Sequence, residues 1–231
     1  MWTAGIDAST GLPSADQLRA FNDNFMSLRR LFAVHSTGGS QLGNLTRRWY
    51  ETVNGTPTLL TATARAELAG NMSPVMSGRT RADFTADFLL ADPFFYAAPV
   101  TTFVGLPTAS VIVSNPGDAV IGYGQGYSGG GQNFTIKLHG PLQDPYLLNA
   151  SAQVSVTVPG IIPSGTSVTL DIGAYTAIST TGANFQGGIS HRGARPWMIV
   201  QPGNSVFLLS SQGTTVPGTS SAEITFSPGY L

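Results

Sequence analysis

The 231-residue chain contains no cysteine, which excludes both a disulfide framework and any metal site built on thiolates. Charge is also scarce, because Asp, Glu, Lys and Arg make up 10% of the residues against about 25% in ordinary soluble domains. The net charge of −1 gives no sign of a nucleic-acid footprint or of attraction to anionic lipid. We therefore expect no nucleic-acid specificity.

A long uninterrupted apolar run is missing too. The most apolar stretch, FLLADPFFYAAPVTTFVGL, is interrupted by Asp92 and by prolines, so we expect no membrane insertion. The first residues, MWTAGIDASTGLPSADQ, have neither a basic start nor an apolar core, and they do not fit a secretory signal peptide.

Glycine and proline are abundant instead, with 28 and 15 residues, which is typical of turn-rich β structure. Residues 1–98 carry 8 basic and 8 acidic side chains, whereas the rest of the chain carries only 3 and 4. Conversely, 20 of the glycines and 11 of the prolines lie after residue 98. This shift predicts two domains, residues 1–98 and residues 99–231, with segment 81–98 as a hinge between them.

The first domain is predicted to contain one helix, over about residues 14–33. Ser14 and Gln17 form a capping box at its start. Apolar residues then recur at spacings of three and four, which predicts one buried stripe: Leu18, Phe21, Phe25, Leu28 and Phe32. Strands are expected over 45–53, 56–68 and 81–91, and the last of these alternates between an apolar face and a charged outer face.

The second domain reads as all-β. Candidate strands lie at 109–115, 119–124, 133–138, 152–159, 167–178, 197–201, 204–211 and 222–227. Four apolar triplets alternate with polar residues and predict the core face: Phe134/Ile136/Leu138, Val154/Val156/Val158, Val168/Leu170/Ile172 and Ala222/Ile224/Phe226. Short strands separated by Gly- and Pro-rich turns predict an antiparallel β-sandwich or jelly roll.

No motif predicts a cofactor or a catalytic centre. Gly124–Gly129 fits G-x-G-x-x-G by letter, but a strand follows it, whereas a dinucleotide site needs a helix there. His35, His139 and His191 lack the spacing of metal ligands. Asp118 and Asp144 lie in turns, and we expect them to serve turn geometry rather than hydrolysis. We expect no cofactor, no metal and no enzymatic activity.

Sugar binding is the alternative function. β-Sandwiches can stack an exposed aromatic ring on a sugar face, and Tyr123, Tyr127 and Trp197 are candidates for binding a host cell-wall glycan. Trp197 begins the strand WMIV, so we favour a core position for it over a glycan contact. A hydrolase of wall polymer has little support, because no suitable pair of carboxyl groups stands out.

A series of motifs resembles one known family. In order, the chain has a helix with LRRLF, then LTRR, the strand ADFTADFLLADPFFY, NPGDA, GPLQDPYLLN, IPSGTSVTLDI and finally W-x-I-x-x-PGNSVF. Together these motifs span roughly residues 14–226, and their order and spacing resemble the distal tail proteins (phage tail or minor tail proteins) of long-tailed bacteriophages.

The resemblance implies a structural virion component rather than an enzyme. Residues 1–98 would be an α+β ring-forming domain, and residues 99–231 a galectin-like antiparallel sandwich. The protein would assemble in the bacterial cytoplasm into a ring, usually a hexamer, at the tail tip or baseplate. Its partners would be other copies of itself, the tail tube protein, the tail-tip hub protein and other minor tail proteins.

The resemblance also suggests where contacts lie. We expect like subunits to meet at Trp49, Tyr50 and the outer face of the 81–91 strand, with Arg81, Asp83 and Asp87.

The link between the domains is expected to start at Asp92, with Phe94, Phe95 and Tyr96 packed at the junction. Family members normally place several strands before the helix, whereas thirteen residues precede it here, so we expect a ring domain lacking its usual first strands.

Overall fold

The computed structural model describes residues 43–53, 56–68, 73–76, 81–85, 87–90, 94–106, 110–122, 134–193, 197–213, 215–216 and 219–231, with Trp2, Thr3, Arg19 and Asp23. The fold is mainly β with several antiparallel sheets, as predicted. Of the helix predicted at 14–33, Arg19 and Asp23 are helical, and the remainder lies outside the described residues. In the part of the chain described here, no helix has the length and apolarity needed to cross a bilayer.

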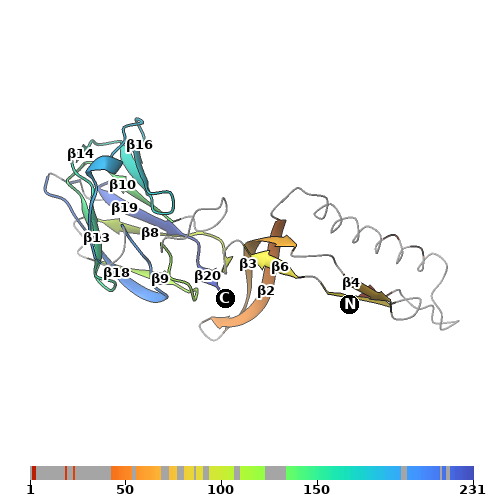
Figure 1. Ribbon diagram of the computed structural model, residues 1–231. Helices are drawn as coiled ribbons and strands as arrows, with labels where there is room; N and C mark the ends of the chain where they lie inside the picture. Colours follow the sequence, from red (N-terminus) through yellow and green to blue (C-terminus); the bar gives the residue numbers. More distant parts are fainter. Residues whose placement is uncertain are drawn as a thin grey trace. The chain divides into compact units, whose positions relative to one another are not determined.

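Two five-stranded antiparallel sheets share one core and form a β-sandwich (Figure 1). The first has the order β16-β15-β10-β19-β8, with strands Thr176–Ser179, Ser167–Asp171, Thr135–His139, Ser221–Phe226 and Val100–Gly105. The second has the order β17-β13-β12-β18-β9, with strands Ser190–Arg192, Val154–Thr157, Tyr146–Asn149, Gly203–Ser210 and Val111–Asn115. A ribbon of β11 (Leu142–Gln143) and β14 (Ile161–Ile162), and the 3₁₀ turn η2 (Gln186–Gly188), complete this part.

The sandwich core follows from the period-two alternation of the sequence. All twelve members of the four predicted apolar triplets are at most 2% exposed, so this prediction is confirmed. Because successive side chains on a strand point to opposite faces, their polar neighbours lie on the outer faces. Phe134 and Phe226 meet edge to face inside the core, with ring centroids 6.3 Å apart.

One predicted strand is in fact a hairpin. The segment 167–178 was expected to run straight, but it turns at residues 172–175 and returns as β16 beside β15. The turn forms because a carboxylate oxygen of Asp171 accepts the backbone N–H of Ala174 at 2.9 Å, while Tyr175 adopts a positive φ of 53°.

Two other predicted strands make only a single bridge. Ile121 and Val200 exchange backbone hydrogen bonds of 2.9 and 3.0 Å, but the segments around them do not extend this pairing into a ladder. Apart from this bridge, residues 119–122 and 197–201 are therefore irregular segments, and Tyr123 and Gly124 of the first predicted strand lie outside the described residues. Ile121 and Val200 are nevertheless fully buried and belong to the core.

Further strands lie outside the sandwich sheets. Strands β2 (Gly43–Val53), β3 (Thr56–Leu68), β7 (Phe95–Tyr96) and β20 (Gly229–Tyr230) form one sheet, and β6 (Phe88–Leu90) pairs with the end of β3. Strands β1 (Trp2–Thr3), β5 (Arg81–Thr85) and β4 (Ser73–Met76) form a three-stranded sheet. The strand expected over 81–91 is therefore two strands, because β5 pairs with β1 and β4 whereas β6 pairs with β3.

The chain forms two compact units. The larger comprises Thr46–Ala64 and Asp92–Leu231, and the smaller comprises Met1–Leu45 and Arg65–Ala91. The larger unit thus adds the β2–β3 hairpin, up to Ala64, to the sandwich. The division into domains 1–98 and 99–231, based on composition, stays a prediction.

Candidate functional site

The predicted contact residues Trp49 and Tyr50 are neighbours on β2 with different surroundings. The indole ring of Trp49 is half-buried and packs edge to face on Tyr230, with centroids 5.0 Å apart. The guanidinium carbon of Arg47 lies 5.0 Å from the same indole, and this arginine also donates a hydrogen bond to the carbonyl of Leu231. Tyr50 is 74% exposed. Trp49 therefore holds the hairpin to the chain's own last strand, and Tyr50 is the side chain offered outward.

The charged residues expected beside them are spread over two segments. Arg81 and Asp83 lie on β5, where the structure describes the backbone but not their side chains. Asp87 is exposed, just ahead of β6.

The aromatic run Phe94–Tyr96 starts the part of the larger unit that leads into the sandwich. Tyr96 is 8% exposed and belongs to the sandwich core, while Phe94 packs against that core with its ring centroid 6.5 Å from that of Tyr96. Phe95 is half-buried and pairs with Tyr230 through β7 and β20. A role of these rings at a domain junction stays a prediction.

The phenol of Tyr230, next to this aromatic run, has a pKa above its ordinary value. Burial raises the pKa of its phenol above the ordinary 10.0, and the nearby carboxylates of Glu51 and Asp118 raise the pKa further. The phenol is therefore neutral in the folded protein at physiological pH, as suits a side chain under the indole of Trp49.

The residues predicted for glycan stacking are not gathered in one described site. Trp197 is 7% exposed, and its indole meets the Tyr175 ring edge to face at 5.4 Å. A ring so buried presents no open face to a sugar, which agrees with the core position favoured for it. Tyr123 and Tyr127 lie outside the described residues.

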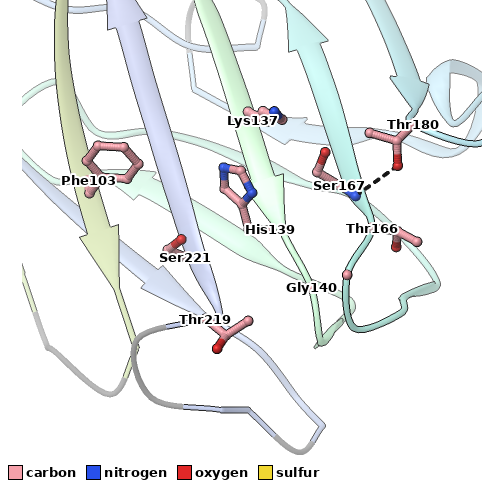
Figure 2. Close-up of a pocket in the computed structure, with 10 residues that line it drawn as sticks. Phe103, Lys137, His139, Gly140, Thr166, Ser167, Thr180, Thr219 and Ser221 are labelled. Atoms are coloured by element: carbon pink, nitrogen blue, oxygen red, sulfur yellow. Dashed lines mark hydrogen bonds between the residues drawn. The ribbon is translucent and has the colours of Figure 1, made fainter.

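A groove that the sequence analysis did not predict lies on the outer face of the first sandwich sheet. It has a volume of about 480 Å³ and is lined by side chains from β8, β10, β15 and β19 and from the adjoining loops. Figure 2 shows these side chains projecting from neighbouring strands on the same face. Six of them carry the chemistry discussed below: Phe103, Lys137, His139, Ser167, Thr180 and Ser221.

Strand register brings the groove's groups together. Glu223 on β19 pairs with Lys137 on β10 and with Phe103 on β8, so these three side chains form one row across the outer face. Nε2 of His139 lies 3.0 Å from Oε2 of Glu223. Because a carboxylate only accepts, the imidazole donates this bond, and a neutral ring then keeps Nδ1 as an acceptor.

The composition held a signal for this site. Lys137 is the chain's only lysine, and Glu223 is the only glutamate after residue 98. In a domain with so few charged residues, each of these two residues is a candidate for a functional site. Within the described residues, no three histidine or acidic side chains lie close enough to share a metal ion.

The comparisons with known proteins bear on the fold. The structure matches the crystal structure of the Dit protein of phage SPP1, described as a paradigm of the hub adsorption apparatus in phages that infect Gram-positive bacteria. The TM-score is 0.51 at 17% sequence identity, over 83% of this chain and 80% of that chain. The chain has a Dit fold. No family model matches the sequence. No curated protein matches it either.

The extent of the match shows how much of the chain is Dit-like. Residues 99–231 alone do not reach 83% of the chain, so the Dit-like match includes a substantial part of the first 98 residues as well as the sandwich. The resemblance found from sequence motifs therefore agrees with the structural match.

Proposed function

We propose that this chain is a distal tail protein of a long-tailed bacteriophage, a structural part of the virion that forms a ring between the tail tube and the tail-tip hub. The observation that carries the proposal is the Dit fold, which spans both halves of the chain rather than a common sandwich alone. The protein would assemble in the bacterial cytoplasm and act at the tail tip. Its partners would be further copies of itself, the tube protein, the hub protein and other minor tail proteins.

Ring formation requires a contact that repeats from one subunit to the next and closes on itself, as a hexamer would. The β2–β3 hairpin is our candidate for this contact, because Tyr50 is 74% exposed and Leu59 is 51% exposed on adjacent strands. Trp49 is committed to Tyr230 within the same chain, so it would stiffen the hairpin rather than reach the neighbour. Low surface charge also suits a subunit held in an assembly.

The proposed role is not enzymatic. Two acids of the second half are engaged with the backbone: Asp144 accepts the N–H of Gly160 at 2.7 Å, and Asp171 accepts that of Ala174 at 2.9 Å. Such bonds shape loops and supply neither a nucleophile nor a proton donor at a substrate. A galectin-like topology of the sandwich is part of the same proposal.

Light scattering coupled to size-exclusion chromatography tests the ring. Over a concentration series, the intact chain is expected to form a single closed multimer, with the hexamer as the favoured size. The double variant Tyr50→Ser, Leu59→Ser is expected to shift the chain toward monomers without lowering its unfolding temperature, because both side chains are exposed.

Ile161→Ser is the matched control, since Ile161 is 66% exposed on β14, away from the hairpin sheet. This variant should assemble as the intact chain does. A chain that stays monomeric at the highest concentration contradicts the ring. A ring that survives the double variant would show that the contact lies away from the hairpin.

A further inference from the structure

The charge-poor sandwich concentrates its ionisable groups on one sheet face. Lys137 and Glu223 are cross-strand neighbours, and Glu223 also accepts a hydrogen bond from His139. The chain's only lysine, its only glutamate after residue 98 and a histidine therefore meet beside the groove. Opposite charges on Lys137 and Glu223 cancel. This pair of charged residues therefore adds donors and acceptors beside the groove without adding net charge.

An apolar ring adjoins these polar groups. Phe103 is 58% exposed on the edge strand β8, directly across from Glu223. A large ring at this exposure gains little from its own fold. Figure 2 shows this ring at one side of the groove near Ser221, with Thr180 at the opposite side, so the ring supplies a flat apolar platform at the edge of a polar groove.

We propose that this groove binds a short neutral saccharide. A sugar ring has an apolar C–H face, which suits the Phe103 platform, and a rim of hydroxyl groups, which both donate and accept hydrogen bonds. Lys137 supplies donors, the threonine and serine hydroxyls both donate and accept, and Nδ1 of His139 supplies an acceptor while Nε2 faces Glu223. Glu223 lies beside the lining residues Lys137 and His139 and balances the charge of Lys137, which favours an uncharged ligand over a phosphate or a carboxylate.

The size of the groove agrees with this ligand class. Its volume of about 480 Å³ falls within the ordinary range of small-ligand sites, and it is open rather than enclosed, as a surface site for one end of a glycan requires. Saccharide binding in this groove requires neither the ring nor the tail location, so the assembly experiment and the binding experiment can fail separately.

The test is binding of the full chain to an array of immobilised oligosaccharides. The neutral arm carries glucose, galactose, rhamnose and N-acetylglucosamine termini, and the anionic arm carries glucuronic acid and glycerol phosphate termini. We expect binding in the neutral arm only. Phe103→Ala should weaken this binding about tenfold or more, because it removes a ring that lines the groove.

Ile112→Ala is the matched control, because Ile112 is 61% exposed on β9, the corresponding edge strand of the other sheet. It should leave binding unchanged. Binding to the anionic arm, absence of binding in both arms, or equal losses from Phe103→Ala and Ile112→Ala would each overturn the proposal.

A second measurement, an NMR signal from the labelled Lys137, tests whether the ligand lies in the groove without any substitution in the groove. Reductive ¹³C-methylation of the intact chain labels its single lysine together with the amino terminus. The Lys137 signal, assigned by its loss in Lys137→Gln, should shift when the neutral oligosaccharide that binds best is added. A saccharide that binds the array but leaves this signal in place would show that the groove is not the site.

Discussion

The indole of Trp49 packs edge to face on the phenol ring of Tyr230, with ring centroids 5.0 Å apart and an interplanar angle of 68°. These two residues lie 181 residues apart in the sequence, so their contact anchors the β2–β3 hairpin to the last strand of the larger unit. Arg47 strengthens this anchor, since it lies against the same indole and donates to the carbonyl of Leu231. The hairpin that we propose as the subunit contact is thus held from within the chain.

Trp49→Ala is expected to lower the free energy of unfolding by about 1–3 kcal/mol, because it removes the aromatic pair and part of a half-buried side chain. Urea unfolding, followed by the circular dichroism of the backbone rather than by tryptophan fluorescence, measures the change. Tyr50→Ala, on the next residue, is the control and should stay within about 0.5 kcal/mol, since that side chain is 74% exposed. Equal effects from both variants would mean that the Trp49–Tyr230 contact does not stabilise the fold.

Tyr230 predicts a loss of stability at alkaline pH. The folded chain holds the phenolic proton more tightly than the unfolded chain, whose pKa is the ordinary 10.0. Stability from this residue is therefore fully present below pH 10 and declines as the pH rises through the higher, folded pKa. The unfolding free energies of the intact chain and of Tyr230→Phe should differ at about pH 8, and this difference should become smaller at about pH 11 as the proton is lost. Parallel behaviour of the two proteins would contradict the raised pKa.

Gly117 is required by a close approach of two backbone segments. The N–H groups of Asp118 and Ala119 both donate to the carbonyl of Gly229, at 2.7 and 3.0 Å, and a Cβ on Gly117 would run into the backbone of Gly229. Gly117→Ala should therefore destabilise the protein by about 1–3 kcal/mol in thermal or urea unfolding. Gly105→Ala, where a Cβ meets open space, should be nearly neutral. The opposite ranking would show that the loop does not close on Gly229 as described.

Phe226 and Phe103 lie on opposite faces of the same sheet. We expect replacement of Phe226 to lower stability, and replacement of Phe103 to weaken saccharide binding without lowering stability. Phe226 is fully buried, and its replacement by Ala should cost about 3–5 kcal/mol in unfolding free energy. Phe103 is 58% exposed, so Phe103→Ala should change stability by less than about 0.5 kcal/mol. Comparable stability losses would mean that Phe103 is a structural residue and would remove its role as a platform.

The sandwich core could be predicted from the sequence because the buried side chains of each strand are apolar residues at every second position, a pattern that is visible within the strand itself. Val154, Val156 and Val158 illustrate this, since all three are buried as the alternation predicts. The turn after Asp171 was missed because apolar and polar residues continue through it, and the reversal depends on the bond from the Ala174 N–H to the Asp171 carboxylate and on the positive φ of Tyr175.

The groove could not be predicted in the same way, because it depends on strand order. His139 and Glu223 lie 84 residues apart in the chain and meet only because β10 and β19 pair. The position of Trp197 posed a similar difficulty, since an aromatic residue at the start of a strand can face either the core or the solvent. Its packing on Tyr175 depends on a turn that the sequence did not reveal.

The central claim, a Dit-type ring at the tail tip, is tested most directly by an electron-microscopy reconstruction of the tail tip of virions that carry this chain. The account predicts a closed ring of like chains, placed between the tail tube and the hub and fitted by the sandwich described here. A tail tip without this chain, or one that holds it as a single isolated copy, would contradict the account.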